Sequence, residues 1–265
     1  MTLSMPSLRD LFCLEGKVAL VTGGAGYLGR AMSEALAELG ARVVVASRNL
    51  EHCQEVASEL GEGHLALRLD ISSAESVRGV VAQVIGECGR VDILVNNAYS
   101  GPLKRIDETT EEDFAVSLAN GVTSYFVAAQ ACWRFMRDHG GGSIINVASM
   151  YGIVGSYPDA YAGTEGCSPP NYHAAKGAVV HLTRHLAVYW AQDGVRVNCL
   201  SPGPFPHPST EKTIPEMVQR LKTKSPMGRM GRRWEVKGAV ALLASEAGSY
   251  ITGHNLVVDG GWTAW

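Results

Sequence analysis

The sequence lacks several features that define whole classes of protein. It contains no uninterrupted apolar run of about 18 residues, so we expect no membrane-spanning helix. It has no block of basic residues and a formal net charge of −3, which argues against nucleic acid as the main partner. The six cysteines include no Cys-x-x-Cys pair, and no set of ligand-type residues suggests a metal site. No leader-like segment opens the chain, so we expect reduced thiols and a cytoplasmic protein.

The chain does have the length and apolar content of a folded α/β protein. Its 265 residues, of which 46% are hydrophobic, can bury a sizeable core. Several of its 30 glycines stand at the ends of apolar runs, where turns and ligand-contacting loops occur. No linker rich in Pro, Gly or Ser divides the sequence, so we expect one domain over residues 1–265.

Seven short apolar runs alternate with helical patterns. The expected strands are Lys17–Thr22, Arg42–Ala46, His64–Leu69, Val91–Val95, Ser143–Val147, Val195–Leu200 and Asn255–Val258. The expected helices run to about Leu39 after the first strand and then cover Glu51–Leu60, Ala74–Cys88, Glu111–Met136 and Tyr172–Gln192. This alternation predicts a three-layer α/β fold, with a doubly wound, parallel seven-stranded sheet between two layers of helices. Ligands of such folds bind at the carboxyl ends of the strands.

Two long segments interrupt the alternation, at about residues 150–171 and 201–230. Both follow a strand, so both leave the carboxyl edge of the predicted sheet. Because long segments of this kind inside a compact domain are commonly functional, we expect two lids over a ligand site.

A glycine-rich turn, Thr22–Gly29 (TGGAGYLG), follows the first strand and opens a helix. Glycines permit a tight turn and close approach to a pyrophosphate, whose charge the free N–H groups of the helix attract. The second strand leads into Ser47-Arg48, with no carboxylate for a ribose 2′-hydroxyl. Arginine and serine suit a 2′-phosphate, so NADP(H) is favoured. If Arg48 is only a solvated surface residue, NAD(H) is accepted as well.

Tyr172 and Lys176 are four residues apart, which places both side chains on one face of a helix. A phenol is a poor base near neutrality, because its ordinary pKa is about 10. A nearby ammonium favours the phenolate and lowers that pKa. The pair is therefore suited to general acid–base catalysis.

Together these motifs resemble the short-chain dehydrogenase/reductase family, in its compact single-domain type with a Rossmann-like fold. The resemblance extends from about Glu15 to Trp265. The ordered motifs that carry it are Thr22–Gly29, Asp70-Ile71, Asn96-Asn97-Ala98, Asn120, Ser149, Tyr172 with Lys176, Pro202-Gly203 and Val258–Gly261.

The resemblance implies four catalytic residues. Tyr172 would be the general acid in ketone reduction and the general base in alcohol oxidation, while Lys176 lowers its pKa and binds the nicotinamide ribose. Ser149 would polarise the substrate carbonyl, and Asn120 would hold a water in a proton relay. The implied cofactor-binding residues are Gly23, Gly26, Tyr27, Leu28, Ser47, Arg48, Asp70, Ile71, Asn97, Ala98, Tyr172, Lys176, Pro202, Gly203 and Phe205.

The chain departs from the compact pattern at the glycine turn. Gly26 and Tyr27 give the spelling Thr-Gly-x-x-Gly-x-x-Gly, which is typical of the extended epimerases and dehydratases that retain NAD. The short segment after the seventh strand argues against the extended type. A second departure is Tyr99, which replaces the glycine that usually follows Asn-Asn-Ala and narrows the space near the cofactor.

The largest departure is spacing. Ser149 precedes Tyr172 by 23 residues, where the family usually has about a dozen. Tyr161 lies 12 residues after Ser149, but Glu165 stands where its lysine should be, and an acid would raise the pKa of the phenol. We therefore keep Tyr172 as catalytic and infer an insertion of roughly ten residues in the substrate loop.

The hypothesis that follows is an oxidoreductase that interconverts a secondary alcohol and a ketone. Its substrate would contact Tyr99, Met150, Tyr151 and the polar, tyrosine-rich loop Gly152–Pro170, which suits a sugar acid, a polyol or a cyclic ketone. The alternatives are an epimerase or dehydratase of the extended type and a nucleotide-binding protein without catalysis.

The family resemblance implies a homotetramer. The helices around Glu111–Met136 and Tyr172–Gln192 would form the main interface, because their apolar positions exceed one narrow stripe. The apolar tail Gly261–Trp265 either reaches a neighbouring subunit or packs within its own.

Overall fold

Residues 5–164 and 168–265 are described by the computed structural model of the protein. Seven parallel strands form one sheet in the order β3-β2-β1-β4-β5-β6-β7. The strands are β1 Val18–Thr22, β2 Arg42–Ser47, β3 Leu65–Arg68, β4 Ile93–Asn96, β5 Gly142–Val147, β6 Val195–Pro202 and β7 Asn255–Val258. All seven expected strands are present, and none of their ends moves by more than two residues. The order reverses between β1 and β4, which confirms the doubly wound sheet.

Burial along the strands explains why they could be found in the sequence. Every residue of β1 and of β4 is buried, as expected for central strands that are covered on both faces. Leu20 of β1 stands opposite Val44 of β2 and Leu94 of β4, so apolar side chains continue across the sheet.

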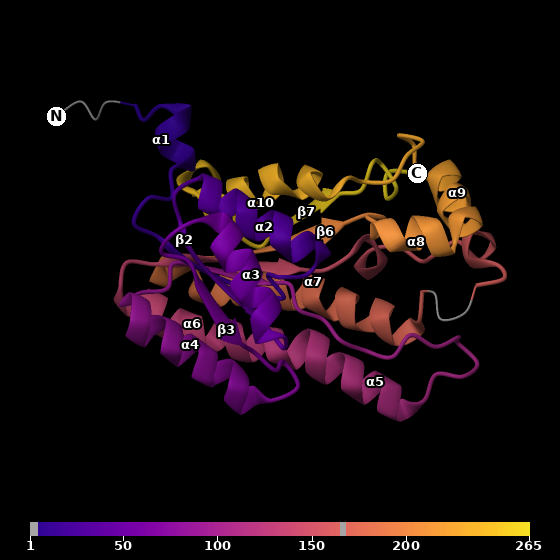
Figure 1. The fold of residues 1–265 in the computed structure, drawn as a ribbon, viewed down its shortest axis with the longest axis horizontal. Helices are drawn as coiled ribbons and strands as arrows, with labels where there is room; N and C mark the ends of the chain where they lie inside the picture. Colours follow the sequence, from indigo (N-terminus) through magenta and orange to yellow (C-terminus); the bar gives the residue numbers. More distant parts are fainter. Residues whose placement is uncertain (1–4, 165–167) are drawn as a thin grey trace.

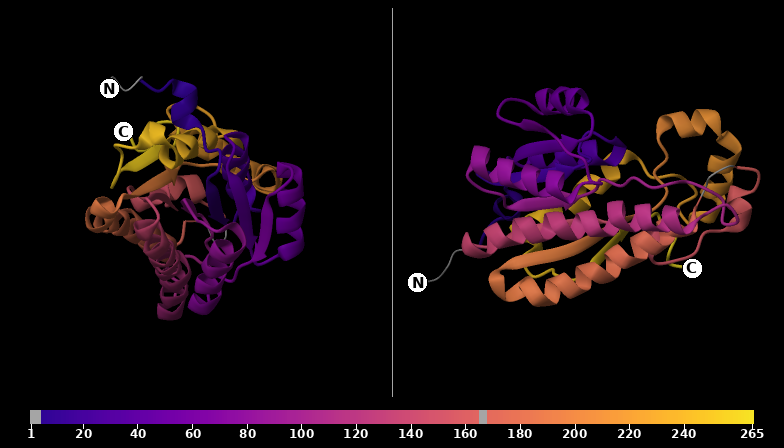
Figure 2. Two further views of the ribbon diagram at one scale, coloured as in Figure 1. Left: turned by 90° about the vertical axis from the view of Figure 1, so that its left-hand side faces the viewer. Right: turned by 90° about the horizontal axis from the view of Figure 1, so that it is seen from below.

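Helices cover both faces of the sheet (Figures 1 and 2). One face carries α2 Tyr27–Glu38, α3 Leu50–Leu60 and α10 Lys237–Ala244. The other face carries α4 Ala74–Cys88, α6 Ser124–Asp138 and α7 Pro170–Trp190. Each layer forms its own buried cluster with one face of the strands, so the three-layer prediction is confirmed. The sequence patterns did not predict α10 or the short α1 Leu8–Phe12.

The long helix expected over Glu111–Met136 is interrupted. It consists of α5 Glu111–Leu118, a π-helical turn over Ala119–Thr123, and α6. A π-helical turn widens the helix locally and is frequent at functional sites. This turn contains Asn120.

Both expected lids lie at the carboxyl edge. The first contains two 3₁₀ turns, Met150–Gly152 and Pro158–Tyr161, and the second contains α8 Pro208–Thr213 and α9 Pro215–Lys224.

Two side chains of α9 hold the lids together. The guanidinium of Arg220 donates to the carbonyl oxygens of Ala160 and Ala162 at 3.1 and 2.7 Å. Lys224 Nζ lies 2.6 Å from the carboxylate of Asp159. Helices α8 and α9 project together at one end of the molecule (Figure 1).

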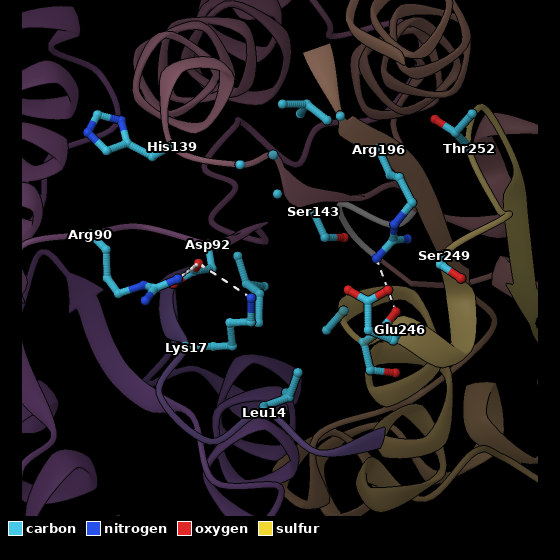
Figure 3. A pocket seen from close by; sticks show the side chains of 18 of the residues that line it. Leu14, Lys17, Arg90, Asp92, His139, Ser143, Arg196, Glu246, Ser249 and Thr252 are labelled. Atoms are coloured by element: carbon cyan, nitrogen blue, oxygen red, sulfur yellow. Dashed lines mark hydrogen bonds and ion pairs between the residues drawn. The ribbon is translucent and has the colours of Figure 1, made fainter. Parts of the chain in front are cut away.

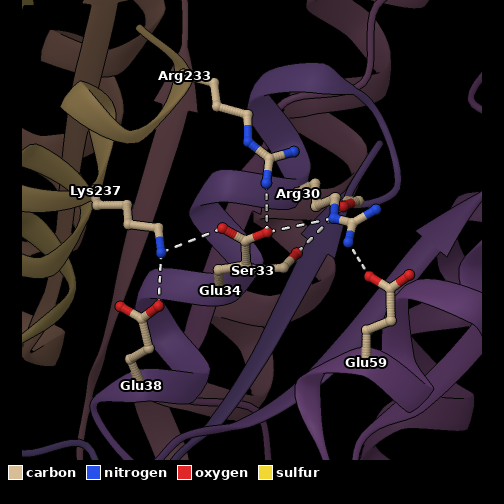
Figure 4. Close-up of polar contacts among 8 residues, drawn as sticks. Arg30, Ser33, Glu34, Glu38, Glu59, Arg233 and Lys237 are labelled. Carbon is tan, nitrogen blue, oxygen red and sulfur yellow. Dashed lines mark hydrogen bonds and ion pairs between the residues drawn. The ribbon is translucent and has the colours of Figure 1, made fainter.

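Glu34 of α2 joins that helix to the segment that follows the second lid (Figure 4). Its carboxylate is 3.3 Å from Arg30 Nε, 3.0 Å from Arg233 Nη2 and 3.2 Å from Lys237 Nζ. Lys237 also pairs with Glu38 at 2.6 Å. The start of α10 is thereby fixed to the helix that follows the glycine turn.

The described part of the chain has no helix that is long and apolar enough to cross a membrane. Within the same residues, no cluster of three or more His, Cys, Asp or Glu side chains could hold a metal ion. Five cysteines there are free thiols, whereas Cys167 and Glu165 lie outside the described residues.

Candidate active site

A cleft of about 430 Å³ opens at the carboxyl ends of β1, β2 and β4. It contains these predicted cofactor-binding residues: Gly23, Gly26, Ser47, Arg48, Ile71, Asn97 and Ala98. This is the crevice where the strand order reverses, which is the ligand site of doubly wound sheets. Asn49 and His52, which no sequence motif singled out, also line the cleft. The feature that could have pointed to them is the start of α3, where Asn49 caps the helix by accepting from the backbone N–H of His52 at 3.1 Å.

The glycine turn is built to receive a phosphate. Gly23 has a φ of 64°, and its N–H donates to the Ala46 carbonyl at 2.7 Å. Helix α2 starts after Gly26, and no side chain caps its first N–H groups, so they are free for an anion. A Cβ on Gly29 would collide with the Gly23 carbonyl oxygen, so the close packing of turn and helix requires glycine there. These features fit the pyrophosphate of a dinucleotide.

Among the predicted cofactor contacts that do not line the cleft, three lie near the glycine turn and after β3. Tyr27 packs edge-on against His207, with ring centroids 5.1 Å apart, and Leu28 packs against the core. The Asp70 carboxylate accepts hydrogen bonds from the backbone and hydroxyl of Ser72 at 3.0 and 2.7 Å, which lowers the pKa of Asp70. Their roles toward a cofactor stay predictions.

The remaining predicted contacts follow β6. Pro202 ends the strand, and the N–H of Gly203 donates to the Val258 carbonyl at 2.9 Å. Phe205 lines a separate pocket of about 100 Å³.

Side chains around the glycine turn fix the end of β4. Asn97 Nδ2 donates to the carbonyl oxygens of Thr22 and Gly23, both at 3.1 Å. Asn96 Nδ2 donates across the strand ends to Asn146 Oδ1 at 3.0 Å, as expected of a structural residue.

Tyr172 and Lys176 lie in the first two turns of α7, and Ser149 follows β5. Lys176 is only 3% exposed, and its Nζ donates to the carbonyl of Val147 at 2.8 Å. Three aromatic rings surround this ammonium, with centroids 5.1, 5.5 and 5.7 Å from Nζ: Tyr99, Tyr125 and Tyr172. The predicted serine, tyrosine and lysine therefore converge at the carboxyl edge.

The pKa values differ from the expectation for the tyrosine–lysine pair. Burial raises the pKa of Tyr172, hydrogen bonding with Ser149 opposes this rise, and Tyr99 adds to it. Burial also lowers the pKa of Lys176, to about 8. The expectation of a lowered pKa for Tyr172 is therefore wrong for the protein chain alone, because desolvation of the phenol is the largest effect on it. The influence of Lys176 on this pKa stays a prediction.

Asn120 points from the π-helical turn toward the loop after β4. Its Nδ2 donates to the carbonyl oxygen of Ser100 at 2.9 Å. The Ser124 hydroxyl donates to the Asn120 carbonyl at 2.6 Å, a contact that joins the π-helical turn to the start of α6. The interruption of the helix thus sets the position of a predicted catalytic side chain.

The inserted loop separates the two candidate tyrosines. The hydroxyls of Tyr161 and Tyr151 form a hydrogen bond 2.5 Å long, whereas Tyr172 bonds with Ser149. The geometry thus agrees with Tyr172 as the catalytic tyrosine. Sequence spacing could not decide this, because the insertion moves the helix start to Pro170.

Aromatic side chains form a wall beside Tyr172. The Tyr99 ring meets Tyr172 edge-on at 5.2 Å, and Tyr151 stacks on His173 at 4.6 Å. Trp262, only 1% exposed, packs edge-on against Tyr151 and Tyr157. The C-terminal tail therefore packs in its own subunit at Trp262, a contact that the sequence left open.

Known proteins are similar to this chain over nearly its whole length. A family model described as enoyl-(acyl carrier protein) reductase matches residues 24–263. A galactitol 2-dehydrogenase (L-tagatose-forming) of Cereibacter sphaeroides is 37% identical, over 97% of this chain and 99% of that protein. A 2-dehydro-3-deoxy-D-gluconate 5-dehydrogenase of Bacillus subtilis (strain 168) is 34% identical, with the same two coverages.

The chain belongs to the short-chain dehydrogenase/reductase family.

Solved structures agree with this assignment. A short-chain dehydrogenase/reductase from Mycobacterium marinum has a TM-score of 0.89 at 39% identity, over 98% of this chain and 100% of that one. A gluconate 5-dehydrogenase from Burkholderia cenocepacia J2315, solved with NADP and tartrate, has a TM-score of 0.87 at 30% identity, with the same coverages. As a member of this family, the protein is an NAD(P)-dependent oxidoreductase that interconverts a secondary alcohol and a ketone.

Proposed function

We propose that the protein is an NADP(H)-preferring dehydrogenase of a polyol or sugar acid. The observation that carries the proposal is the convergence of Ser149, Tyr172 and Lys176 beside a cleft that contains Ser47 and Arg48. The two relatives named above are a dehydrogenase of a polyol and one of a sugar acid, which supports this substrate class.

In ketone reduction, Tyr172 donates its proton to the carbonyl oxygen of the substrate. Its raised pKa keeps the phenol protonated at neutral pH, as this direction requires. Ser149 donates a hydrogen bond to the same oxygen, Lys176 places a positive charge nearby, and Asn120 connects the site to solvent through a water. The bound nicotinamide supplies the hydride.

The cofactor choice rests on the end of β2. Arg48 is exposed and forms no ion pair with a described residue. Its charge adds a smaller contribution to the lowering of the Asp70 pKa, which is caused mainly by the hydrogen bonds from Ser72. A 2′-phosphate would accept from the Arg48 guanidinium and the Ser47 hydroxyl. Tyr27, Leu28, Asp70, Ile71, Pro202, Gly203 and Phe205 complete the proposed cofactor site.

The substrate would lie against Tyr99, Tyr151, His173 and Trp262, beneath the two lids. Aromatic faces pack against the C–H faces of a sugar chain, and their polar edges bond its hydroxyls. We also propose that the chain forms one domain, assembles as a homotetramer and acts in the cytoplasm.

Consumption of NADPH and of NADH with a panel of polyol-derived ketones and keto-acids tests the proposal. We expect turnover with NADPH to exceed that with NADH. Tyr172→Phe should retain cofactor binding, measured by nicotinamide fluorescence. Its turnover rate should fall by a factor of about 10²–10⁴. Equal turnover by Tyr172→Phe would contradict the catalytic assignment, and a preference for NADH would contradict the cofactor assignment.

A further inference from the structure

A second cavity, of about 600 Å³, lies at the opposite edge of the sheet, where the strands begin. Its walls are the connections that enter β1, β4, β5, β6 and β7. No proposed catalytic or cofactor-binding residue lines it. The volume is within the range of small-molecule sites, so the lining decides what could bind there.

One side of this amino-edge cavity carries a carboxylate, that of Asp92, which already accepts hydrogen bonds from within the protein. Asp92 accepts from the backbone N–H of Val18 at 2.8 Å and from Arg90 Nε and Nη2 at 2.7 and 2.6 Å. Lys17 Nζ is 3.9 Å from the same carboxylate, and the Lys17 side chain is 43% exposed. The Asp92 oxygens are already engaged, so the ammonium of Lys17 is left with only a distant anionic partner.

The other side carries a guanidinium that lacks a carboxylate partner. Arg196, from β6, donates to the carbonyl oxygens of Ser245 and Ile251 at 3.2 and 3.4 Å, and burial lowers its pKa. No described carboxylate lies within 4.0 Å of the Arg196 guanidinium. Glu246 lies beyond ion-pair distance, and its charge partly opposes the lowering of the Arg196 pKa by burial. In Figure 3, Arg196 and Glu246 lie across the cavity from Lys17, Arg90 and Asp92.

A buried hydroxyl without a partner adds an independent observation. Ser245 is 2% exposed, and its Oγ is buried without a hydrogen-bond partner. The residue lines the cavity and also provides the carbonyl to which Arg196 donates. Buried polar groups in folded proteins are nearly always paired, so this unpaired hydroxyl suggests a missing acceptor or donor.

We propose that the amino-edge cavity binds a small molecule through a carboxylate or phosphate group. Arg196 and the Ser245 hydroxyl donate to the anion, and Lys17 faces it from the other side. Guanidinium, hydroxyl and ammonium groups are all donors, and carboxylate and phosphate oxygens are the acceptors that match them. The site is separate from catalysis, because β4, β5 and β6 start at the cavity and end at the catalytic edge.

Calorimetric titration of the NADP-saturated protein tests the proposal, because the cofactor then occupies the phosphate-binding turn. Inorganic phosphate and malonate are titrated separately, and sodium chloride at equal ionic strength controls for screening. We expect saturable binding of one of these anions and none of chloride. The tighter anion identifies the group as a phosphate or a carboxylate.

Variants locate the binding. Ser245→Ala removes an unpaired hydroxyl, so we expect unchanged unfolding without the anion and a Kd weakened about fivefold or more. Lys17→Gln should also weaken binding, whereas Arg78→Gln, which removes one charge from the exposed face of α4, should not. The proposal is overturned if neither anion binds saturably, or if both Ser245→Ala and Lys17→Gln bind as tightly as Arg78→Gln.

Discussion

Lys176 holds a positive charge where almost no water reaches it. It is 3% exposed, three aromatic rings surround it, and its one described hydrogen bond goes to the carbonyl of Val147. No described carboxylate lies within ion-pair distance of it. The charge that the proposed mechanism assigns to Lys176 therefore lowers the stability of the free protein, as is common for groups placed for function.

This cost makes a prediction for pH dependence. Burial lowers the pKa of Lys176 from 10.5 to about 8. Below pH 8 the folded and unfolded chains both bind the proton, whereas between pH 8 and 10.5 the unfolded chain binds more. The free energy of unfolding of the natural protein, relative to Lys176→Met, should therefore rise across this window, by about 3 kcal/mol at most. Urea unfolding of both proteins at several pH values measures the difference, and a difference that is constant with pH would contradict the lowered pKa.

Tyr99 stands where the family usually has a glycine, and it lies next to Tyr172 and Lys176. Its ring contacts Tyr172 and lies 5.1 Å from Lys176 Nζ. A Cβ on Gly121, in the π-helical turn, would approach that ring to 2.9 Å, so the turn leaves room for Tyr99.

Replacing Tyr99 should therefore change the pH profile of catalysis. Tyr99→Leu removes the ring and hydrates Lys176, so its pKa moves back toward the ordinary value and the alkaline limb of kcat/KM moves to higher pH. We also expect kcat to fall about tenfold through lost positioning. Tyr99→Phe keeps the ring and is the matched control. Identical profiles for the Leu and Phe variants would show that the ring has no such role.

At the scale of elements, the strands could be predicted because their signal is local. The central strands are short apolar runs that are buried on both faces, as β1 Val18–Thr22 and β4 Ile93–Asn96 illustrate. The break between α5 and α6 could not be predicted, since it inserts one residue into a turn without a proline. Helices α8 and α9 were missed because they lie in the segment 201–230, where proline, glycine and basic residues obscure the periodicity.

The candidate site was predictable where a motif specifies chemistry and not where packing decides. Ser149, Tyr172 and Lys176 come together as their order along the chain predicts. The position of Trp262 against Tyr151 depends on how the tail crosses the lids, which no local pattern encodes.

The contact between α9 and the inserted loop is open to a direct test. Arg220→Ala removes two hydrogen bonds to backbone carbonyls of the 3₁₀ turn Pro158–Tyr161 and its end. We expect KM for the substrate to rise about fivefold, with a smaller change in kcat, because the lids position substrate and do not transfer protons. Gln219→Ala, at the exposed neighbouring position, is the control. A loss of kcat with KM unchanged would argue against a positioning role.

For the whole molecule, the exposed apolar side chains of α5, α6 and α7 support the proposed assembly. Val188 and Tyr189 are 76% and 69% exposed, and Leu118 and Phe126 are 38% and 36% exposed. Apolar groups gathered on neighbouring helices usually mark an interface.

A charge within this surface should prevent assembly. We expect Val188→Glu to elute as a smaller species in size-exclusion chromatography with light scattering, because an unpaired carboxylate at a subunit contact is costly to bury. Leu8→Glu, at a position of similar exposure on α1, should leave the assembly unchanged. A tetramer that persists in Val188→Glu would place the interface elsewhere.

The strand order has a consequence for how the chain folds during synthesis. Leu20 of β1 pairs with Val44 of β2 on one side and with Leu94 of β4 on the other. Leu94 is synthesised later than Val44, so the second side of β1 stays unpaired for longer. A chain emerging from the ribosome therefore exposes one edge of its most apolar strand until β4 is made. Unpaired strand edges template aggregation, and parallel sheets fold slowly because their pairings are distant in sequence. A nascent chain that stalls before Asn96 would thus be the form that depends most on chaperones.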